Sequence, residues 1–587
     1  AISERGRRGL PLERIYRQLF DRELFLYAYG RIHRNSGALT RGVTAETVDG
    51  MSLAKIDAII DALHHERYRW TPVRRVEIPK SNGKTRPLGI PTWSDKLVQE
   101  VIRLILDAYY EPRFSAHSHG FRPGRGCHTA LSECYTTFQG SAWFIEGDIS
   151  ACFDSFDHAV LLAILAETIH DGRFLRLLGN LLKAGYLEDW RFHRTLSGTP
   201  QGGIVSPVLA NIYLSKLDAF VETVLIPANT RGDQRAVNRR YGALRTKAAR
   251  LRRKGDWAEE RLVKRQMHTM PSVDPHDPAY RRLRYVRYAD DWLLGFVGPK
   301  AEAEAIKARL REFLRDTLKL ELSDAKTLIT HARTAKAHFL GYEVNVVQND
   351  HLHDRTGKRS SNGVVGLEVP TGVIDAKCAQ YSRNGKPVHR PERSHNTEFS
   401  IIEQYQAEFR GVALYYALAH NRHTLSRLRW VMEQSLTKTL AHKLRLTVSQ
   451  VYARFQDTIA TPHGPRRGLT VRVERGEGKK PLVAHWGGVS LARQTRAILN
   501  DQPQRIWNDR TEVVERLLAD TCELCGSRER VQVHHVRALK DLQRPGRGPR
   551  PAWETAMAAR RRKTLVVCED CHRDIHNGYP VRRRIAE

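Results

Sequence analysis

The first candidates for chemistry are two adjacent carboxylates, Asp290 and Asp291, in residues 287–292 (RYADDW). Apolar runs at 283–286 and 292–297 flank the pair and predict two strands joined by a tight turn. Adjacent carboxylates repel one another, so the ionised pair needs a cation close by. A solvated turn would contain the same residues, whereas a divalent metal shared with a third acid would suit phosphoryl transfer.

A suitable third acid is Asp148. Residues 142–149 (AWFIEGDI) predict a buried strand that ends in this carboxylate. An acid at the end of one strand and an acidic hairpin on the next strand could converge on two metal ions. Phe153, five residues further on, would overhang the same place.

A second centre is expected near the C-terminus, where two CxxC pairs have the spacing of a four-thiolate zinc site. The cysteines are Cys522, Cys525, Cys568 and Cys571. Between the pairs, a short predicted strand carries His534 and His535, and the last cysteine is followed by His572 and His576. The second histidine pair is spaced i, i+4, which places both rings on one helix face. A zinc ribbon with incidental histidines is the alternative.

Several segments are expected to position these residues. The sequence predicts a basic hairpin at 76–91 that carries Lys80 and Arg86, and a glycine-containing helix entry at 199–207 that includes Gln201. Helical periodicity marks most of the remaining apolar segments, and 320–330 and 337–347 are predicted as further strands of the sheet that carries the acids. The predicted helices lie at 12–30, 53–68, 96–110, 130–138, from 158, and at 208–224, 300–318 and 397–457.

Three segments lack strong core patterns. Residues 228–284 are polar and rich in arginine, with predicted helix around 235–268, and suggest either a nucleic-acid contact or a structural excursion. Residues 349–395 are expected to form a linker or a mobile loop, and 462–510 a basic, loop-rich segment.

Within 397–457, cations and aromatics interleave, which suits RNA or DNA binding and equally suits the surface of a three-helix unit. These residues are Arg410, Tyr415, Tyr416, Lys438 and Lys443.

Composition points to a polyanionic partner. The 587 residues contain 96 Lys and Arg against 65 Asp and Glu, which gives a formal net charge of +31. Such an excess of Lys and Arg is suited to neutralising the phosphates of a nucleic acid. The sequence contains no apolar run of about 18 residues, so no membrane span is expected. The cysteine pattern suits a reducing compartment with one metal site, and we expect a cytoplasmic location, with an organelle as an alternative.

Quoted in order, the blocks IPK…RPLGIP, HGFRPGRG, EGDISACFDSFDH, GTPQGGIVSPVLANIYL, RYADD and FLGY resemble those of group II intron reverse transcriptases. The segment FRGVALYYALAHN…SLTKTLAHK resembles the maturase (X) region, and residues 522–576 resemble HNH (ββα-metal) nucleases. One departure concerns the central Asn of the HNH motif, which is not evident near 560–564 (RRRKT). The resemblance covers essentially the whole chain.

The resemblance implies an α+β multidomain protein. Its parts would be a right-hand reverse transcriptase (fingers, and a palm with an antiparallel sheet), a helical thumb/maturase domain and a ββα-metal nuclease. The expected boundaries are 1–140 for an N-terminal extension and fingers, 141–348 for the palm with its insertion at 228–284, 349–396 for a linker, 397–460 for the thumb, 461–515 for a basic DNA-binding segment, and 516–587 for the nuclease with zinc knuckles.

The resemblance also implies residue roles. Asp148, Asp290 and Asp291 would carry two Mg²⁺ ions, with Asp148 and Asp290 indispensable. Nucleotide contacts would come from Lys80 and Arg86 at the triphosphate, Phe153 at the sugar 2′-position, and Gln201 near the nucleotide or template. In the nuclease, His535 would be the general base, the other three histidines would hold one divalent ion, and the four cysteines structural Zn²⁺.

The partners implied are intron RNA in a lariat ribonucleoprotein, target DNA and dNTPs, and the implied activities are splicing assistance, nicking and target-primed cDNA synthesis. Three other hypotheses stay open. The chain could be a splicing-only maturase, a reverse transcriptase with no intron partner, or chiefly a DNA endonuclease. The intact acids at 148, 290 and 291 argue against the first hypothesis.

Overall fold

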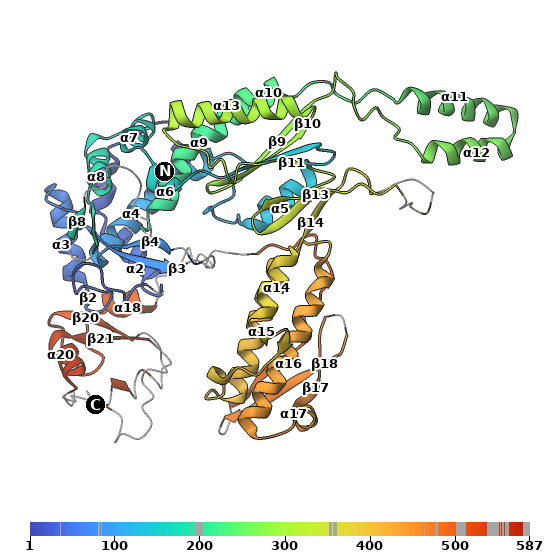
Figure 1. Cartoon of the computed structure of the whole chain (residues 1–587). Helices are drawn as coiled ribbons and strands as arrows, with labels where there is room; N and C mark the ends of the chain where they lie inside the picture. Colours follow the sequence, from blue (N-terminus) through green and yellow to red (C-terminus); the bar gives the residue numbers. More distant parts are fainter. Residues whose placement is uncertain are drawn as a thin grey trace.

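A computed structural model of the chain describes residues 1–35, 37–79, 83, 85–188, 191–193, 203–350, 355, 361–462, 464–475, 479–499, 512–536, 551, 553–554, 557 and 563–578. A central sheet lies at the top of Figure 1, and two arms descend from that level. One arm holds the N-terminal helices with the C-terminal strands below them, and the other holds the helices from α14 to α17. No described helix is both long and apolar enough to cross a membrane.

The central sheet is antiparallel, and its strand order is β11-β5-β10-β9. Its strands are β5 (Trp143–Gly147), β9 (Arg282–Tyr288), β10 (Asp291–Val297) and β11 (Ile329–His331). The predictions for 142–149, 283–286 and 292–297 are therefore confirmed.

Alternate residues of these strands enter two different hydrophobic cores. Ile145 and Leu294 pack in one core, and their neighbours Phe144 and Leu293 pack in the other. This is the period of two that a sheet covered on both faces requires. The first core includes α9 (Ser206–Phe220) and α13 (Lys300–Leu318), and the second includes α5 (Cys127–Thr137). Figure 1 shows α13 and α5 on opposite sides of the sheet.

The basic hairpin is confirmed as β3 (Val73–Pro79) and β4 (Thr85–Ile90), which belong to a second sheet with β7 (Tyr186–Glu188) and β8 (Arg191–His193). Around it lie α3 (Leu53–His64) and α4 (Trp93–Tyr110), close to their predicted positions.

The single helix predicted at 12–30 is wrong. The segment divides into β1 (Leu12–Glu13), the 3₁₀ helix η1 (Ile15–Phe20) and α2 (Arg22–Ile32). Arg14 has a left-handed backbone with φ of 53°, and Asp21 caps α2 by accepting the Glu23 N–H at 2.9 Å. An N-cap side chain stabilises a new helix start in place of a continuing helix.

The prediction that 320–330 and 337–347 join the same sheet is correct only for β11. The strands β12 (Ala337–Phe339) and β13 (Tyr342–Val346) form a separate sheet with β14 (Val365–Glu368). A turn at Leu340 and Gly341, both with positive φ, folds β13 back on β12 instead of along β5.

The linker predicted at 349–395 is also corrected. Its described part contains β14, α14 (Thr371–Ala379), the short pair β15 (Ser382–Arg383) and β16 (Lys386–Pro387), and a 3₁₀ turn. Val365, Leu367 and Ile374 are buried in the second core, so scattered apolar residues were sufficient to build structure here.

The helical character predicted for 397–457 is confirmed by α15 (Glu398–Tyr415), α16 (Leu425–Leu444) and α17 (Val448–Phe455). The loop-rich prediction for 462–510 is wrong over 466–486. There, β18 (Arg466–Arg475) and β19 (Lys479–Trp486) form an antiparallel sheet with β17 (Gln456–Ile459). Leu469, Ala484 and Trp486 are buried in the second core, and the exposed basic residues between the apolar ones hide this period from a sequence analysis.

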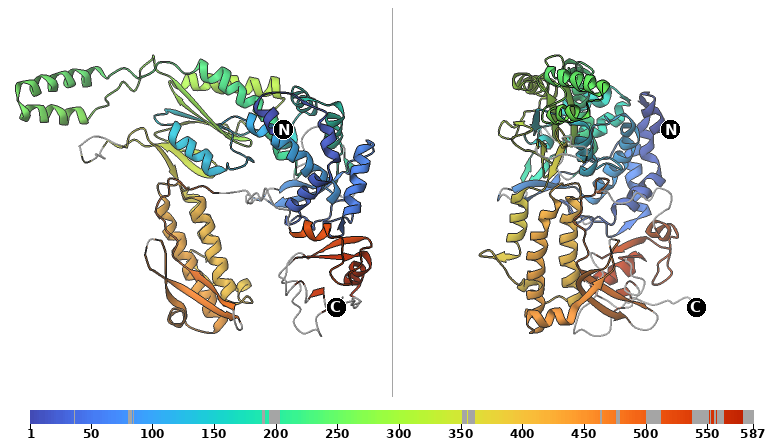
Figure 2. Two further views of the ribbon diagram at one scale, coloured as in Figure 1. Left: turned by 180° about the vertical axis from the view of Figure 1, so that it is seen from behind. Right: turned by 90° about the vertical axis from the view of Figure 1, so that its right-hand side faces the viewer.

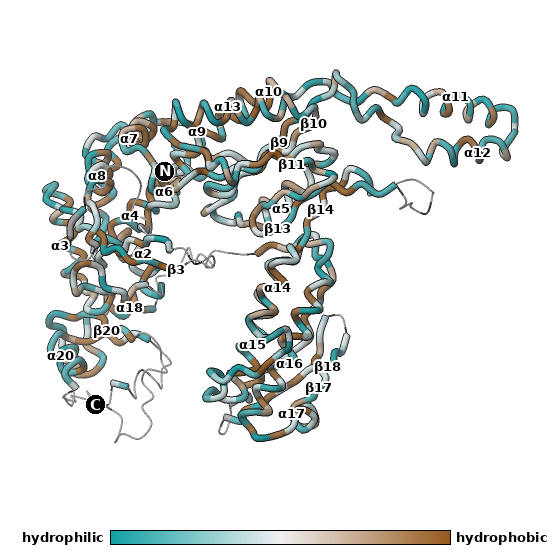
Figure 3. The backbone as a smooth tube through the Cα atoms, in the orientation of Figure 1, coloured by the Kyte–Doolittle hydropathy of each residue, from teal (hydrophilic) through white to brown (hydrophobic). Residues whose placement is uncertain are grey.

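Residues 228–284 contain the predicted helices, α11 (Arg239–Lys254) and α12 (Trp257–His268). They form a hairpin that projects away from the rest of the molecule and is largely hydrophilic (Figures 1 and 3). Its small core consists of Ala248, Val263 and Met267.

The described C-terminal part contains two antiparallel strands and a helix: β20 (Val531–His535), β21 (Thr564–Cys568) and α20 (Glu569–Asn577). A strand from the other end of the chain, β2 (Met51–Ser52), pairs antiparallel with β20 and completes a three-stranded sheet. The helix α18 (Glu512–Leu518) packs against α2, and its Val513, Val514 and Leu517 belong to the core of the N-terminal helices. Both views of Figure 2 show the C-terminal strands directly beneath the N-terminal helices.

Candidate functional sites

The three predicted acids lie at one end of the central sheet. Trp292 pairs with Gly147, so the next residues in register are Asp291 and Asp148. Tyr288 pairs with Asp291, which leaves Ala289 and Asp290 as a two-residue turn, with Ala289 in the left-handed region at φ of 56°. Strand register therefore places Asp148 next to Asp291, at the turn that contains Asp290, and their role as metal ligands stays a prediction.

The electrostatics of the turn favour a cation. Burial raises the pKa of the Asp290 carboxyl, and the charge of Asp148 raises it further. Partial loss of hydration, together with the charges of Asp290 and Asp148, raises the pKa of Asp291 to about 6. Carboxylate oxygens are the hard donors that Mg²⁺ prefers, so these residue types suit the predicted ion.

Lys326 provides one positive charge at this place. Its Nζ lies 3.0 Å from Asp148 Oδ2, although the lysine side chain remains 68% exposed. The backbone N–H of Ser323 donates to Asp148 O at 2.9 Å, so the segment after α13 is held against the end of β5. The sequence analysis assigned Lys326 no role, and its position after the sheet was the only available signal.

A buried arginine behind the turn supports the acids. Arg287 is fully buried and donates to both carboxylate oxygens of Asp218, from Nε at 2.7 Å and from Nη2 at 2.6 Å. It also donates to Ala289 O at 2.7 Å and to Ser118 Oγ at 2.9 Å. One guanidinium thus ties the turn to α9 and to the loop before α5, and the sequence analysis missed this role because its partners are 69 and 169 residues away.

Two glycines allow close packing at this end of the sheet. A Cβ on Gly120 would lie 2.3 Å from Ala289 N, and a Cβ on Gly147 would lie 1.9 Å from the Trp292 indole. The basic loop at 118–129 therefore lies against the acidic turn through backbone.

Aromatic rings surround the turn. Phe153 is partly buried, and its ring centroid lies 6.4 Å from that of Phe121, whose own ring is 6.5 Å from Tyr288. Phe121 is 45% exposed and has a left-handed backbone, and the sequence analysis did not single it out.

Of the other predicted nucleotide contacts, the structure describes only Arg86. Arg86 is exposed on β4, opposite Ile78. Lys80 and Gln201 lie outside the described residues. Their roles, and that of Phe153, stay predictions.

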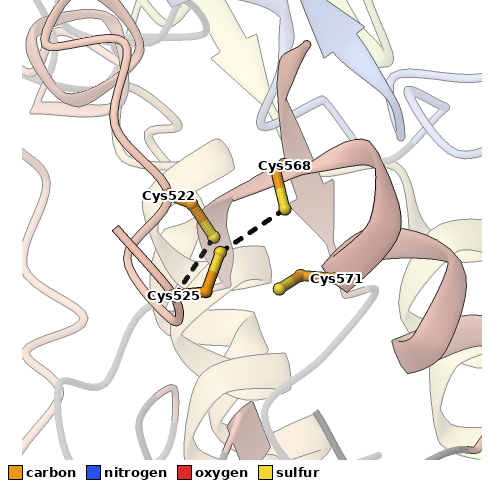
Figure 4. Close-up of side chains that lie close together, drawn as sticks. All are labelled: Cys522, Cys525, Cys568 and Cys571. Carbon is orange, nitrogen blue, oxygen red and sulfur yellow. Dashed lines mark hydrogen bonds between the residues drawn. The ribbon is translucent and has the colours of Figure 1, made fainter. Parts of the chain in front are cut away.

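The four predicted zinc cysteines converge (Figure 4). Their sulfur atoms all lie within 4.8 Å of one another, and the Sγ atoms of Cys525 and Cys568 are 3.6 Å apart. Zinc–thiolate bonds of 2.3 Å place tetrahedral sulfurs ~3.8 Å apart, so this arrangement fits Zn²⁺. Cys568 ends β21 and Cys571 lies in the first turn of α20, and the CxxC spacing therefore presents both to the same point.

Three of the four predicted histidines form a second cluster. His572 Nε2 lies 3.2 Å from both His534 Nδ1 and His576 Nε2. A residue that the sequence analysis did not consider, Asp49, joins them, with Oδ1 3.2 Å from His572 Nε2 and Oδ2 2.7 Å from His576 Nε2. The donor atoms of all four residues lie within 4.8 Å of one another, and a mixed set of imidazoles and a carboxylate suits a divalent metal.

The three clustered histidines are the predicted ligands, whereas His535, predicted as the general base, lies outside the cluster and its role stays a prediction. The ring of His535 contacts α2, where its Nε2 lies 3.3 Å from the Tyr29 hydroxyl. Neighbouring residues in a strand point to opposite faces, so His534 and His535 separate. Burial lowers the pKa of His535 to about 3, which keeps the ring neutral.

The residues predicted to bind RNA or DNA have mostly internal contacts. Tyr415 and Tyr416 donate from their hydroxyls to Leu340 O at 2.8 Å and Gly341 O at 3.0 Å, and only 5% of Tyr416 is exposed. These bonds attach α15 to the turn between β12 and β13.

The cations of this set differ among themselves. Lys438 donates to Pro387 O at 2.7 Å and Lys443 to Ser394 O at 3.3 Å, whereas Arg410 is exposed. Nucleic-acid contact stays a prediction for all five residues, and Arg410 is the one whose side chain is most available.

Comparison with protein families finds three matches along the chain. Residues 78–241 match the reverse transcriptase (RNA-dependent DNA polymerase) family, 373–467 match the type II intron maturase family, and 522–572 match the AI2M/AI1M-like HNH endonuclease family. The predicted polymerase and endonuclease activities are therefore supported by separate parts of one chain.

Similar proteins match nearly the whole chain. The group II intron-encoded protein LtrA of Lactococcus lactis subsp. cremoris is 38% identical over 584 residues, which cover 96% of this chain and 95% of LtrA. A 91 kDa protein in the cob intron of Schizosaccharomyces pombe is 36% identical, over 95% of this chain and 69% of its own length. The COX1/OXI3 intron 2 protein of Saccharomyces cerevisiae is 31% identical, over 96% of this chain and 66% of its own length. With its reverse transcriptase, maturase and HNH endonuclease parts, the chain belongs to the family of group II intron-encoded proteins.

Proposed function

We propose that the chain binds its own intron RNA, assists splicing, and then drives insertion of the intron into DNA. In this proposal, the HNH part nicks one strand of the target, and the new 3′-OH primes cDNA synthesis. The observation that carries it is that one chain holds a histidine cluster suited to a metal, three acids at one end of the central sheet, and a maturase region. A net charge of +31 suits an RNA partner and DNA target together.

The polymerase site is assigned to Asp148, Asp290 and Asp291, which would hold two Mg²⁺ ions. Bound Mg²⁺ would lower the pKa of the primer 3′-OH, align it with the dNTP and stabilise the leaving pyrophosphate. Arg287 keeps the turn in place through Ala289 O, so both of its acids face Asp148 without adjustment when substrate arrives. Lys326 neutralises part of the acidic charge through Asp148 until cations take over that role.

The nucleotide would lie between this turn and the basic hairpin. Phe153 is proposed to screen the sugar 2′-position, because it is held beside the acids by Phe121 and Phe156 at ring distances of 6.4 and 6.0 Å. Lys80 and Arg86 are proposed to hold the triphosphate, and Gln201 to lie near the nucleotide or template. Cations from neighbouring strands suit a phosphate chain.

The nuclease site is assigned to His534, His572 and His576, which would hold one divalent ion. The ion would act as a Lewis acid at the scissile phosphate. The cysteines would hold Zn²⁺ as a structural ion that fixes β21 and α20, and with them His572 and His576. A water-activating role for His535 requires its ring to leave Tyr29 and lose its burial.

The remaining parts would serve the nucleic acids. We assign 1–140 to fingers, 141–348 to a palm with the projecting hairpin at 228–284, and 397–460 to the thumb and maturase domain. Residues 461–515 would contact DNA, and 516–587 form the ββα-metal nuclease. Arg410, Tyr415, Tyr416, Lys438 and Lys443 are proposed to lie on the RNA or DNA path, and the ribonucleoprotein is proposed to act in the cytoplasm.

The test is a reconstituted complex with intron RNA and a DNA duplex that carries the insertion site. Strand cleavage and dNTP incorporation are followed for the wild type, Asp290→Ala and His572→Ala. We expect Asp290→Ala to abolish synthesis and leave nicking, and His572→Ala to abolish nicking and still extend a pre-nicked primer. Synthesis and nicking that proceed without RNA would contradict the intron partnership.

A further inference from the structure

The nuclease centre is not built from the C-terminal region alone. Asp49 lies 485 positions before His534 in the sequence, yet its carboxylate reaches all three clustered histidines. The family match for the nuclease begins at residue 522, so it does not include this acid. We propose that Asp49 is a direct ligand of the nuclease metal, so that the N-terminal region completes a centre shared between two ends of the chain.

The distances have the values that metal ligation requires. Five donor separations in the cluster are 3.2, 3.2, 3.3, 3.2 and 2.7 Å, and they involve three ring nitrogens and both oxygens of Asp49. Ligands 2.0–2.1 Å from a tetrahedral metal lie ~3.3 Å apart. The same bond length in an octahedral site gives ~3.0 Å. The observed set falls around these two values.

The protonation pattern of His572 also favours a metal. Its Nδ1 lies 2.8 Å from Gln532 Oε1, an acceptor, so the neutral ring carries its proton on Nδ1 and presents the Nε2 lone pair to the cluster. A second hydrogen bond that orients a ligating imidazole is the usual arrangement at metal sites. Gln532 is itself held by the strand pairing of β20 with Ser52, two residues from the hairpin histidines.

The backbone fixes Asp49 at this position. Gly50 N–H donates to Val533 O at 3.0 Å, and the Asp49 carboxylate accepts the His535 N–H at 2.7 Å. Gly50 has φ of 79°, a conformation that side chains disfavour, and this turn directs Asp49 over the histidines as β2 begins. The carboxylate is therefore oriented before any ion binds, as a ligand should be.

This inference rests on the proposed nuclease function and extends it. Three neutral imidazoles carry no charge, whereas the Asp49 carboxylate adds one negative charge and a hard oxygen, which strengthens binding of a divalent ion. The nuclease would then depend on docking of the N-terminal region through β2 and α2, and the polymerase body would control whether the nick can be made.

The experiment measures metal binding on the full-length chain with its zinc retained. Co²⁺ is titrated and its visible absorption bands, which report the coordination, are recorded for the wild type, Asp49→Asn, Asp49→Glu, His572→Ala and Asp61→Asn. Asp49→Asn preserves the acceptor for the His535 N–H, so it removes the charge and leaves the docking. Asp61 is a matched control, because it lies in α3 of the same region and its side chain is 56% exposed.

We expect Asp49→Asn to weaken Co²⁺ binding by more than the about 10- to 100-fold typical of losing an outer-shell partner and to change the bands, with partial recovery in Asp49→Glu and no change in Asp61→Asn. Unchanged affinity in Asp49→Asn while His572→Ala loses binding would overturn the inference and leave the proposed nuclease intact. Tighter Co²⁺ binding and faster nicking in Asp49→Asn would also overturn it, because Asp49 would then be a cap that competes with the ion. If His572→Ala also had no effect, the nuclease assignment itself would fail.

Discussion

The acidic and the histidine-rich candidate centres are constructed in opposite ways. The acidic centre lies within one sheet, where strand register alone sets Asp148 beside Asp291 and a two-residue turn adds Asp290. The histidine centre takes one donor from residue 49 and three from residues 534–576, and it depends on strand β2 pairing across the length of the chain.

The difference shows which segments of the chain each centre needs to hold its side chains in place. The acidic centre is held by neighbours in the same fold, above all by Arg287, Asp218 and Gly120, and the hydrogen bonds of these described residues come from residues 117–292. The histidine centre has a local framework in the four clustered cysteines but takes its fourth donor from a distant segment. Four changes test this contrast.

The largest effect is expected from loss of the zinc site. Structural zinc supplies about 10–16 kcal/mol of folding free energy in small zinc modules, so Cys568→Ser should unfold β21 and α20. We expect loss of zinc, loss of nicking and increased hydrogen exchange over 563–578, with primer extension retained. Cys378→Ser, at a buried thiol outside both described metal clusters, is the control. Equal loss of primer extension would show that the two regions fold as one unit.

The converse change is Asp218→Ala, which leaves the Arg287 guanidinium buried without its carboxylate. Breaking a buried pair in this way is expected to cost about 3–5 kcal/mol. Hydrogen exchange should increase for the amides of β9 and β10, and dNTP incorporation should be lost while nicking persists. Asp316→Ala removes an exposed pair with Arg315 and should have no such effect. Unaltered exchange in Asp218→Ala would disprove the supporting role of Arg287.

A smaller effect is expected from Gly120→Ala. The new Cβ would lie 2.3 Å from Ala289 N, so the turn must move. A displacement near 1 Å can lower the rate of a positioned reaction about 100-fold, and single-turnover primer extension measures it. Gly411→Ala, where nothing lies within 4 Å, provides the control. Equal rates in both variants would mean that the loop at 118–129 does not restrain the acids.

The smallest effect concerns pH. The pKa of Asp291 is about 6 in the folded chain and near 3.9 when unfolded, so the folded state binds this proton more tightly. The stability contributed by that proton is present below pH ~4 and is lost as the pH rises to about 6. In thermal unfolding without divalent ions, the Tm of Asp291→Asn should therefore rise relative to the Tm of the wild type as the pH increases across this range. A difference in Tm between the two proteins that does not change with pH would refute the raised pKa of Asp291. Added Mg²⁺ should reduce the relative rise in the Tm of Asp291→Asn.

Much of the fold could be predicted from periodicity. Short apolar runs predicted β5, β9 and β10, and the basic hairpin at 76–91 was predicted as well. Prediction failed where local signals were weak or interrupted. Asp21 begins a new helix inside an apparently continuous apolar segment, and the exposed arginines of β18 conceal its buried Leu469 and Val471.

The sequence by itself determined the chemistry of both centres, because ligand type and close spacing are local properties. Paired acids, two CxxC pairs and an i, i+4 histidine pair predicted which residues gather, and family resemblance predicted the activities. Tertiary structure alone decided the rest. Long-range strand pairing placed Asp49 among the histidines, burial against Tyr29 removed His535 from them, and the ion pair with Asp218 made Arg287 the support of the acidic turn. These contacts join residues 69 to 527 positions apart, and no local pattern encodes such separations.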